Sequence, residues 1–120
     1  MQQWEDTQPI YQQLRGLVVR RILNGSLPEG SAVPSVRQVA ADEQINPLTV
    51  SRAYQLLVEE NLLEKRRGLG MYVREGARQT ALVRERQQFL KQEWPKIRRR
   101  VRDLDLDVEQ LLLAEDDHAQ

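Results

Sequence analysis

The stretch INPLTVSRAYQLL, residues 45–57, predicts a helix with two faces of different character. One face is apolar at the i, i+3, i+4, i+7 spacing by which a helix buries one side, and it consists of Val50, Ala53, Tyr54 and Leu57. The opposite face carries Leu48, Thr49, Ser51, Arg52 and Gln55. A helix that only supports a core more often has Glu and Lys there, whereas these side chains can approach another molecule closely. The outer face is therefore predicted to bind a partner.

A shorter helix is predicted just before this one. Ser35 can cap it at the N-terminus, and Gln38, three residues on, would complete a capping box. The helix ends near Glu43, and Asn46 can then cap the next helix, with Pro47 in the first helical position, where its missing N–H costs nothing. Two helices joined by such a turn make a helix-turn-helix. An ordinary helical hairpin remains the alternative, because most short helix pairs bind no nucleic acid.

The segments on either side complete a small domain. Apolar residues at helical spacing predict a first helix from about Pro9 to Leu23, which Asn24-Gly25 ends. The turn-rich GSLPEGSAVP follows, and Pro34 at its end disfavours helix in the residue before it. On the other side, LLEKRRGLGMYV, residues 62–73, predicts two strands around a glycine-containing turn.

The tip of this hairpin combines positive charge with backbone freedom. Lys65, Arg66 and Arg67 concentrate charge beside it, while Gly68 and Gly70 permit the positive φ angles of a tight turn and a close approach of the backbone to a partner. Exposed hairpins often carry Lys or Arg only to prevent edge-to-edge pairing. Directly after a helix-turn-helix, however, this hairpin is interpreted as a wing.

Taken together, these motifs resemble the DNA-binding domain of the GntR superfamily of bacterial transcription regulators. The matching segments are PIYQQLRGLVVRRILNGSLPEGSAVPS at 9–35, PSVRQVA at 34–40, NPLTVSRAYQLLVEENLL at 46–63 and RRGLGMYV at 66–73. The Asn-Pro-x-Thr-Val start of the recognition helix and the short helical remainder resemble the YtrA-type branch. The resemblance covers residues 7 to about 75. Leu48, where this branch often has Asn, and Met71, where Thr is usual, depart from the pattern and concern base preference and the wing tip.

The resemblance implies a DNA-binding site, because the recognition helix of such a domain enters the major groove. The predicted DNA-binding residues are Ser35, Arg37, Asn46, Leu48, Thr49, Ser51, Arg52, Gln55, Arg66, Arg67, Gly68 and Gly70. Polar side chains of the outer face can reach phosphates or base edges, and Leu48 can touch a thymine methyl group. Arg37 is included because the resemblance makes it a DNA contact. Arg66 and Arg67 would bring charge to the minor groove or to flanking phosphates.

The C-terminal remainder has an apolar seam close to a heptad repeat, formed by Val83, Leu90, Trp94, Ile97, Val101 and Leu104. Pro95 predicts a kink or break near Trp94, and Asp107 to Gln110 can form a second capping box. Helices of this kind cannot bury their apolar faces alone, so they need another chain or the winged domain. We expect a DNA-binding domain at 1–75 and a helical dimerisation tail at 76–120, with an acidic end that can be disordered.

Charge is divided along the chain. Residues 1–102 hold all 18 Lys and Arg against 11 acidic residues, a net charge of +7, whereas residues 103–120 hold seven acids and no Lys or Arg. The basic part can bind a polyanion while the acidic end stays away from it. Two solvated charge classes with no partner are an equally good explanation of the charges alone.

Composition excludes several classes of protein. The chain has no cysteine and a single histidine, His118, so neither a disulfide framework nor a metal site is expected, and no cofactor is predicted. No constellation of His, Cys or paired acids indicates an enzyme. The N-terminus lacks a signal-peptide pattern and no apolar run has the length of a membrane span, so a cytoplasmic protein is expected.

The sequence thus predicts a mainly α fold with a small β-hairpin, a winged helix-turn-helix followed by a C-terminal helical dimerisation segment. The predicted function is a cytoplasmic DNA-binding transcriptional regulator, a repressor that binds a palindromic operator in double-stranded DNA as a homodimer. The alternative is a winged-helix adaptor that binds another protein. A small-molecule effector is not identified by any motif.

Overall fold

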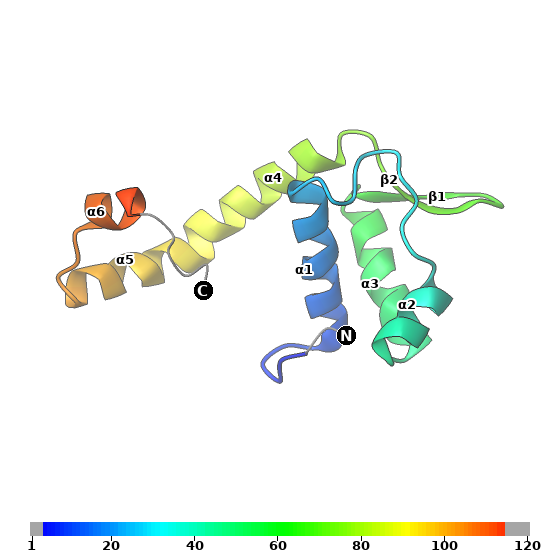
Figure 1. Cartoon of the computed structure of the whole chain (residues 1–120), viewed down its shortest axis with the longest axis horizontal. Helices are drawn as coiled ribbons and strands as arrows, with labels where there is room; N and C mark the ends of the chain where they lie inside the picture. The colour runs from blue at the N-terminus through cyan, green and yellow to red at the C-terminus, as the bar shows by residue number, and fades with distance from the viewer. Residues whose placement is uncertain (1–3, 115–120) are drawn as a thin grey trace. The chain divides into compact units, whose positions relative to one another are not determined.

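The computed structural model describes residues 4–114, which form mainly helices and one β-hairpin (Figure 1). The elements in chain order are α1 (Ile10–Leu23), α2 (Val36–Glu43), α3 (Pro47–Glu59), β1 (Leu63–Arg66), β2 (Gly70–Val73), α4 (Ala77–Gln88), the π-helical turn η1 (Phe89–Glu93), α5 (Trp94–Asp103) and α6 (Val108–Leu113). They divide into two compact units, Met1–Val83 and Arg84–Gln120. The division lies further along the chain than the sequence-based domain boundary after residue 75.

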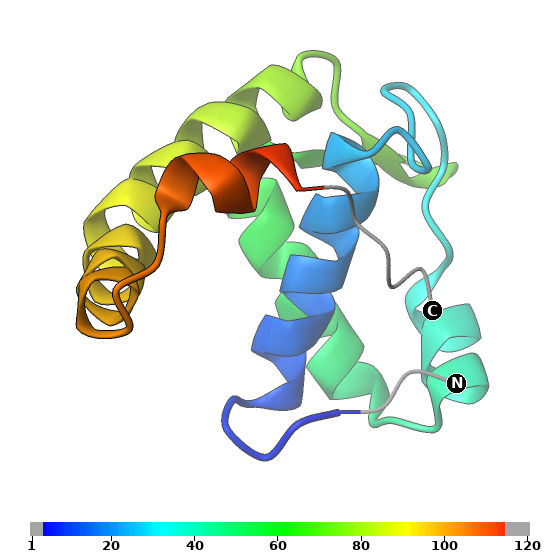
Figure 2. The same cartoon turned by 60° about the vertical axis from the view of Figure 1, so that its left-hand side comes forward.

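The core of the first unit lies where α1 packs along α3 (Figures 1 and 2). Val50, Ala53 and Leu57 on α3 are fully buried, and Tyr54 is 3% exposed, which confirms the predicted inner face. From α1 the core takes Leu14, Val18, Val19 and Ile22. A bidentate ion pair joins the two helices as well, since Arg15 Nε and Nη2 lie 2.8 and 2.7 Å from the carboxylate oxygens of Glu60.

Side-chain caps begin α2 and α3. The Ser35 hydroxyl accepts a hydrogen bond from the Gln38 backbone N–H at 3.0 Å, and the Asn46 side chain accepts one from the Leu48 N–H at 2.8 Å. Both N-caps were predicted, but the capping box at Ser35 is only half formed. The Gln38 amide donates to the Asp42 carboxylate at 2.9 Å instead of turning back to Ser35. An ionised acceptor one turn further along the helix offers a stronger, charge-assisted bond.

The hairpin has the predicted strands, with Leu63 paired to Val73, Lys65 to Met71 and Arg66 to Gly70. Gly68 and Gly70 have φ of +76° and +112°, so the tip uses their freedom. A third segment, which the sequence did not predict, pairs with the other edge of β2. Val33 N–H donates to Met71 at 2.9 Å and Val73 N–H donates to Ser31 at 2.9 Å. Residues 31–33 therefore tie the loop between α1 and α2 to the wing.

The start of α4 is fastened to the first unit by its own contacts. The Glu29 carboxylate accepts hydrogen bonds from the backbone N–H groups of Gly76 at 2.8 Å and Arg78 at 3.2 Å. These backbone hydrogen bonds, the one from Gly76 first, hold the pKa of Glu29 below its usual value. Ala77 and Ala81 are buried in the core. The first turns of α4 therefore belong to the winged part of the chain.

In the second unit, the predicted irregularity near Trp94 is a π-helical turn. The Trp94 N–H donates to the Phe89 carbonyl, five residues back, and the two aromatic rings lie 6.4 Å apart. Pro95 has no N–H for an α-helical bond, which explains why the helix departs from the α pattern at this point. Helical dihedrals are kept at Gln88, Glu93 and Trp94, so the chain does not break.

The short helix α6 starts at the predicted cap. Asp107 accepts hydrogen bonds from the backbone N–H groups of Glu109 at 3.0 Å and Gln110 at 3.3 Å. The last part of the acidic end, residues 115–120 with His118, lies outside the described residues. Among residues 4–114, no helix is both long enough and apolar enough to cross a membrane.

Candidate nucleic-acid interface

Most of the outer face of α3 is exposed. Leu48 is 76% exposed, and Ser51, Arg52 and Gln55 are exposed as well, whereas Thr49 is half-buried. The Asn46 side-chain oxygen is engaged in the cap, and the Gln55 amide donates to Glu59 at 3.3 Å. The helix thus presents an apolar tip, a hydroxyl, a guanidinium and an amide along one face, a set of groups suited to base edges and phosphates.

Arg52 has a partner that the sequence analysis missed. Its guanidinium carbon lies 3.8 Å from the centre of the Tyr11 ring, the geometry of a cation–π contact. Tyr11 stands one helical turn before Leu14 on α1, on the side of that helix that packs in the core. The i, i+3 spacing of Tyr11 and Leu14 was the available signal, but only the fold shows that α3 places Arg52 over this ring.

The three basic residues of the hairpin lie on its two faces and at its tip. Arg66 is held by an ion pair with Glu64 at 3.1 Å, and its guanidinium lies 4.1 Å from the centre of the Tyr72 ring. Because side chains alternate along a strand, Lys65 shares a face with the buried residues Leu63 and Val73. Arg67 is exposed at the tip. Only Lys65 is therefore directed to the side of the hairpin that covers α3.

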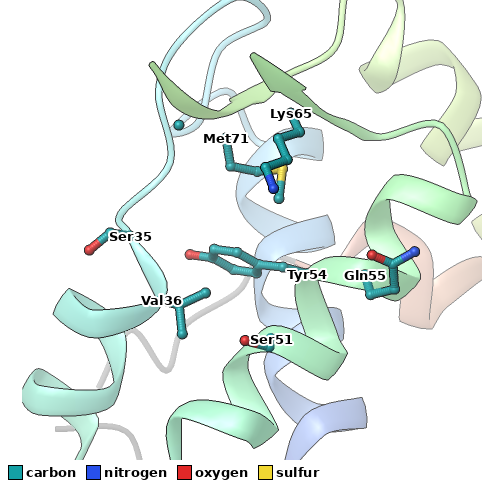
Figure 3. Close-up of a pocket in the computed structure, with 8 residues that line it drawn as sticks. Ser35, Val36, Ser51, Tyr54, Gln55, Lys65 and Met71 are labelled. Atoms are coloured by element: carbon teal, nitrogen blue, oxygen red, sulfur yellow. The ribbon is translucent and has the colours of Figure 1, made fainter. Parts of the chain in front are cut away.

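A pocket of about 340 Å³ lies between the start of α2, the outer face of α3 and the hairpin (Figure 3). Its walls include Ser35 and Val36 from α2, Ser51, Tyr54 and Gln55 from α3, and Lys65, Gly70 and Met71 from the hairpin. In Figure 3 the Lys65 and Met71 side chains extend from the strands toward the Tyr54 ring. The pocket brings together four of the predicted DNA-binding residues, Ser35, Ser51, Gln55 and Gly70.

The Tyr54 hydroxyl donates to the Pro34 carbonyl at 2.6 Å, and this bond links α3 to the residue before the N-cap of α2. Burial raises the pKa of Tyr54 to about 12. The Tyr54 hydroxyl is therefore neutral at physiological pH, and its hydrogen bond to Pro34 holds the ring in place in the pocket wall.

The remaining predicted residues belong to the same elements but do not line this pocket. Arg37 is exposed in the first turn of α2 and makes no hydrogen bond or ion pair with any other residue between 4 and 114. Arg67 and Gly68 are at the exposed hairpin tip, beyond the pocket. The predicted set thus comes from α2, α3 and the hairpin of one compact unit.

The predicted seam of the tail is accessible within a single chain. Val83, Leu90, Ile97 and Leu104 are 44%, 59%, 42% and 52% exposed, while Trp94 and Val101 are half-buried. In α6, Leu111, Leu112 and Leu113 are 51%, 80% and 79% exposed. Monomeric proteins rarely leave so many large apolar side chains in water.

Three helices that contain a helix-turn-helix, followed by a β-hairpin, define the winged helix-turn-helix class of fold. Residues 10–73 match the family model described as bacterial regulatory proteins, gntR family. The match extends over more than half of the sequence, and the chain belongs to the GntR family. This finding confirms the resemblance noted in the sequence.

Similar proteins include named regulators. The chain is 38% identical over 85 residues to the HTH-type transcriptional repressor YtrA of Bacillus subtilis, a match that covers 71% of this chain and 65% of the repressor. It thus spans less than two thirds of that relative's length.

Solved structures resemble nearly the whole chain. A GntR family transcriptional regulator from Listeria monocytogenes aligns with a TM-score of 0.71 and 26% identity over 91% of this chain and 94% of that one. YtrA from Sulfolobus acidocaldarius, a GntR-family transcription factor, aligns with a TM-score of 0.59 and 26% identity over 88% and 98% of the two chains. The helical part after the wing is therefore also found in other members of the family.

Proposed function

We propose that the chain is a cytoplasmic transcriptional repressor that binds a palindromic operator in double-stranded DNA as a homodimer. The observation that carries the proposal is the exposed outer face of α3, held between the start of α2 and a basic hairpin. A helix presented in this way can enter the major groove, while the hairpin reaches the neighbouring minor groove or its phosphates. The similarity to YtrA of Bacillus subtilis, a transcriptional repressor, supports the same role.

The contacts divide into two kinds. In this proposal, Leu48, Ser51 and Arg52 read base edges, because they are exposed on the helix that would enter the groove. Arg37, Arg66 and Arg67 lie around them and supply charge for phosphates, contacts that position the protein more than they specify sequence. The site residues predicted from the sequence keep these roles in the proposal.

The homodimer rests on the exposed apolar side chains of the tail. A single winged domain covers only a few base pairs, whereas a two-fold dimer combines two half-sites. The seam from Val83 to Leu104 offers the apolar surface that such a dimer would bury. In this proposal, the bound dimer represses by occluding transcription from the operator.

The test begins with selection of duplexes from a random-sequence library by the full chain. The proposal expects a palindromic consensus, two chains per duplex by sedimentation, and an affinity that falls steeply with salt because phosphate contacts release counterions. The adaptor alternative expects no enriched sequence and no such salt dependence. Absence of any enriched duplex, with folded protein, would contradict the repressor proposal.

A further inference from the structure

The pocket between α3 and the hairpin has a chemistry of its own. Its one cation is Lys65, whose ammonium makes no ion pair or hydrogen bond with any of the described residues. Hydroxyl groups come from Ser35 and Ser51, and no carboxylate lines the space. The rest of the wall combines the Gln55 amide, which donates to Glu59 at 3.3 Å, and Gly70 with an apolar surface formed by the Tyr54 ring, Val36 and Met71. The Tyr54 hydroxyl is already used by Pro34.

This combination matches one unit of a nucleic-acid backbone. Anionic phosphate oxygens can accept from an ammonium and from hydroxyl groups, while the C–H faces of a deoxyribose can pack against an aromatic ring and a thioether. At about 340 Å³ the pocket has room for more than a bare ion. Lys65 is exposed, and a neutral ligand would displace water from its ammonium without supplying an anionic partner.

The position of the pocket points to the same occupant. One sugar–phosphate backbone separates the major groove from the adjacent minor groove of a duplex. In the proposed function α3 lies in the major groove and the hairpin in the adjacent minor groove, so that backbone must pass between them. The space between them is this pocket.

We propose that this pocket binds a backbone phosphate of the strand that runs between the two grooves, with Lys65 as its charged ligand and Ser35 and Ser51 as hydroxyl donors. The inference rests on the proposed DNA binding and adds a site to it. Lys65 was not among the residues assigned to DNA from the sequence. Its register with Leu63 on the strand is the signal that distinguishes it from Arg66, which faces Tyr72 and Glu64.

The experiment uses the full chain and the selected duplex. Lys65→Met keeps the aliphatic stem and removes the charge, Lys65→Arg keeps the charge, and Lys91→Met, an exposed lysine of η1, is the matched control. Lys65→Met is expected to bind specific and random duplex about tenfold more weakly and to lower the slope of log K against log salt by about 1. Lys65→Arg should keep the slope, and Lys91→Met should change neither quantity.

The phosphate itself is identified by replacing single phosphates of the duplex with uncharged methylphosphonates. At one position per half-site, the methylphosphonate should weaken binding of the wild-type chain by about the same factor as the Lys65→Met substitution does. The same methylphosphonate should not weaken binding of the Lys65→Met variant any further. The phosphate site would be overturned, with duplex binding unaffected, if Lys65→Met bound as tightly as the Lys91→Met control. It would also be overturned if the effects of Lys65→Met and of the methylphosphonate were additive at every position. Failure of the wild-type chain to bind any duplex would overturn the proposed function and the site with it.

Discussion

Arg52 is positioned before any ligand arrives, because its guanidinium lies on the Tyr11 ring. A long, flexible side chain normally loses conformational freedom when it binds, and a stacked guanidinium has lost part of it already. In the proposed DNA complex, recognition by α3 would therefore depend on a residue of α1 that need not touch DNA. Sequence inspection assigned Arg52 to the site from its face of the helix, but the Tyr11 contact depends on how two helices pack.

Replacing Arg52 should reduce specific recognition. Arg52→Ala is expected to weaken binding to the selected duplex by about 1–3 kcal/mol, as is Arg37→Ala, since each removes a charged contact at the groove. Tyr11→Leu should lose about 0.5–1 kcal/mol of that affinity, whereas Tyr11→Phe should keep it because the aromatic face remains. Fluorescence titration of labelled duplex measures these changes, with Arg20→Ala as a control away from the site. If both Arg52→Ala and Arg37→Ala bound the duplex with wild-type affinity, the role given to α3 would be contradicted.

Tyr54 predicts a dependence of stability on alkaline pH. Its pKa in the folded chain, about 12, lies above the ordinary value of 10, so the neutral form is favoured by folding. This contribution to stability is fully present below pH 10 and is lost as the pH rises from 10 through about 12. The total loss of unfolding free energy is roughly 2–3 kcal/mol. Urea unfolding at pH 8 and at pH 11 should show a larger loss for the wild type than for Tyr54→Phe. At pH 8, Tyr54→Phe itself should cost about 1–2 kcal/mol, because the Pro34 carbonyl loses its donor. Identical pH profiles would contradict the burial of the hydroxyl.

At the scale of elements, the two residues of the α2 cap, Ser35 and Gln38, should differ in how much each contributes to stability. Ser35→Ala should cost about 1 kcal/mol of unfolding free energy because it removes the acceptor for the Gln38 N–H. Gln38→Ala should change stability by less than about 0.5 kcal/mol, since its side chain makes only an exposed contact with Asp42 one turn along. A full capping box would make both changes costly. Urea titrations followed by circular dichroism distinguish the two cases.

The two arginines of the hairpin should contribute unequally to DNA binding. Replacement of Arg66 and Arg67 together is expected to lower the slope of log K against log salt by about 1–2, for specific and random duplex alike. Arg67→Ala alone should account for most of this change, because the charge of Arg66 is already paired with Glu64. Binding isotherms at several salt concentrations measure it. An unchanged slope in the double variant would mean that the hairpin tip does not contact DNA.

Sequence patterns were sufficient for most elements of the first unit. Helical periodicity and the capping residues Ser35 and Asn46 predicted α2 and α3, and Gly68 and Gly70 predicted the hairpin turn. The pairing of residues 31–33 with β2 could not be predicted, because it is made by backbone groups and leaves no alternation of side chains. Pro95 predicted an irregular helix but not its form. The π turn depends on the Trp94 N–H reaching Phe89, which no local pattern reveals.

The candidate site was predicted less completely than the fold. Which side chains face outward on α3 follows from the burial of Val50 and Leu57, so the spacing was enough. Lys65 was grouped with Arg66 and Arg67 as tip charge, since its direction depends on the register of two strands and on the helix they cover. Contacts between elements, such as that of Arg52 with Tyr11, cannot be predicted from the sequence pattern of a single segment.

For the whole molecule, assembly should govern stability. If the tail seam is buried between two chains, the melting temperature of the wild type should rise with protein concentration, because dissociation accompanies unfolding. Ile97→Glu places a charge in that seam and should abolish the concentration dependence, whereas Lys96→Glu, at an exposed position beside it, should retain it. Sedimentation equilibrium of the three proteins gives the oligomeric state directly. A wild-type monomer that still binds the palindrome tightly would contradict the assigned role of the tail.

The hydrogen bonds of Glu29 also bear on the order in which the chain folds. They join residues 47 and 49 positions apart in sequence, so the entropy of closing a long loop must be met before they can form. Each helix and the hairpin depend on shorter connections and should form first, whereas the packing of α1 on α3 closes a loop of similar length, since Arg15 and Glu60 lie 45 positions apart. During synthesis, the carboxylate is made well before the backbone groups it will hold, and the first turn of α4 should dock last. A chain stalled before Gly76 would then carry an assembled wing but no fixed start for the helix that leads to its tail.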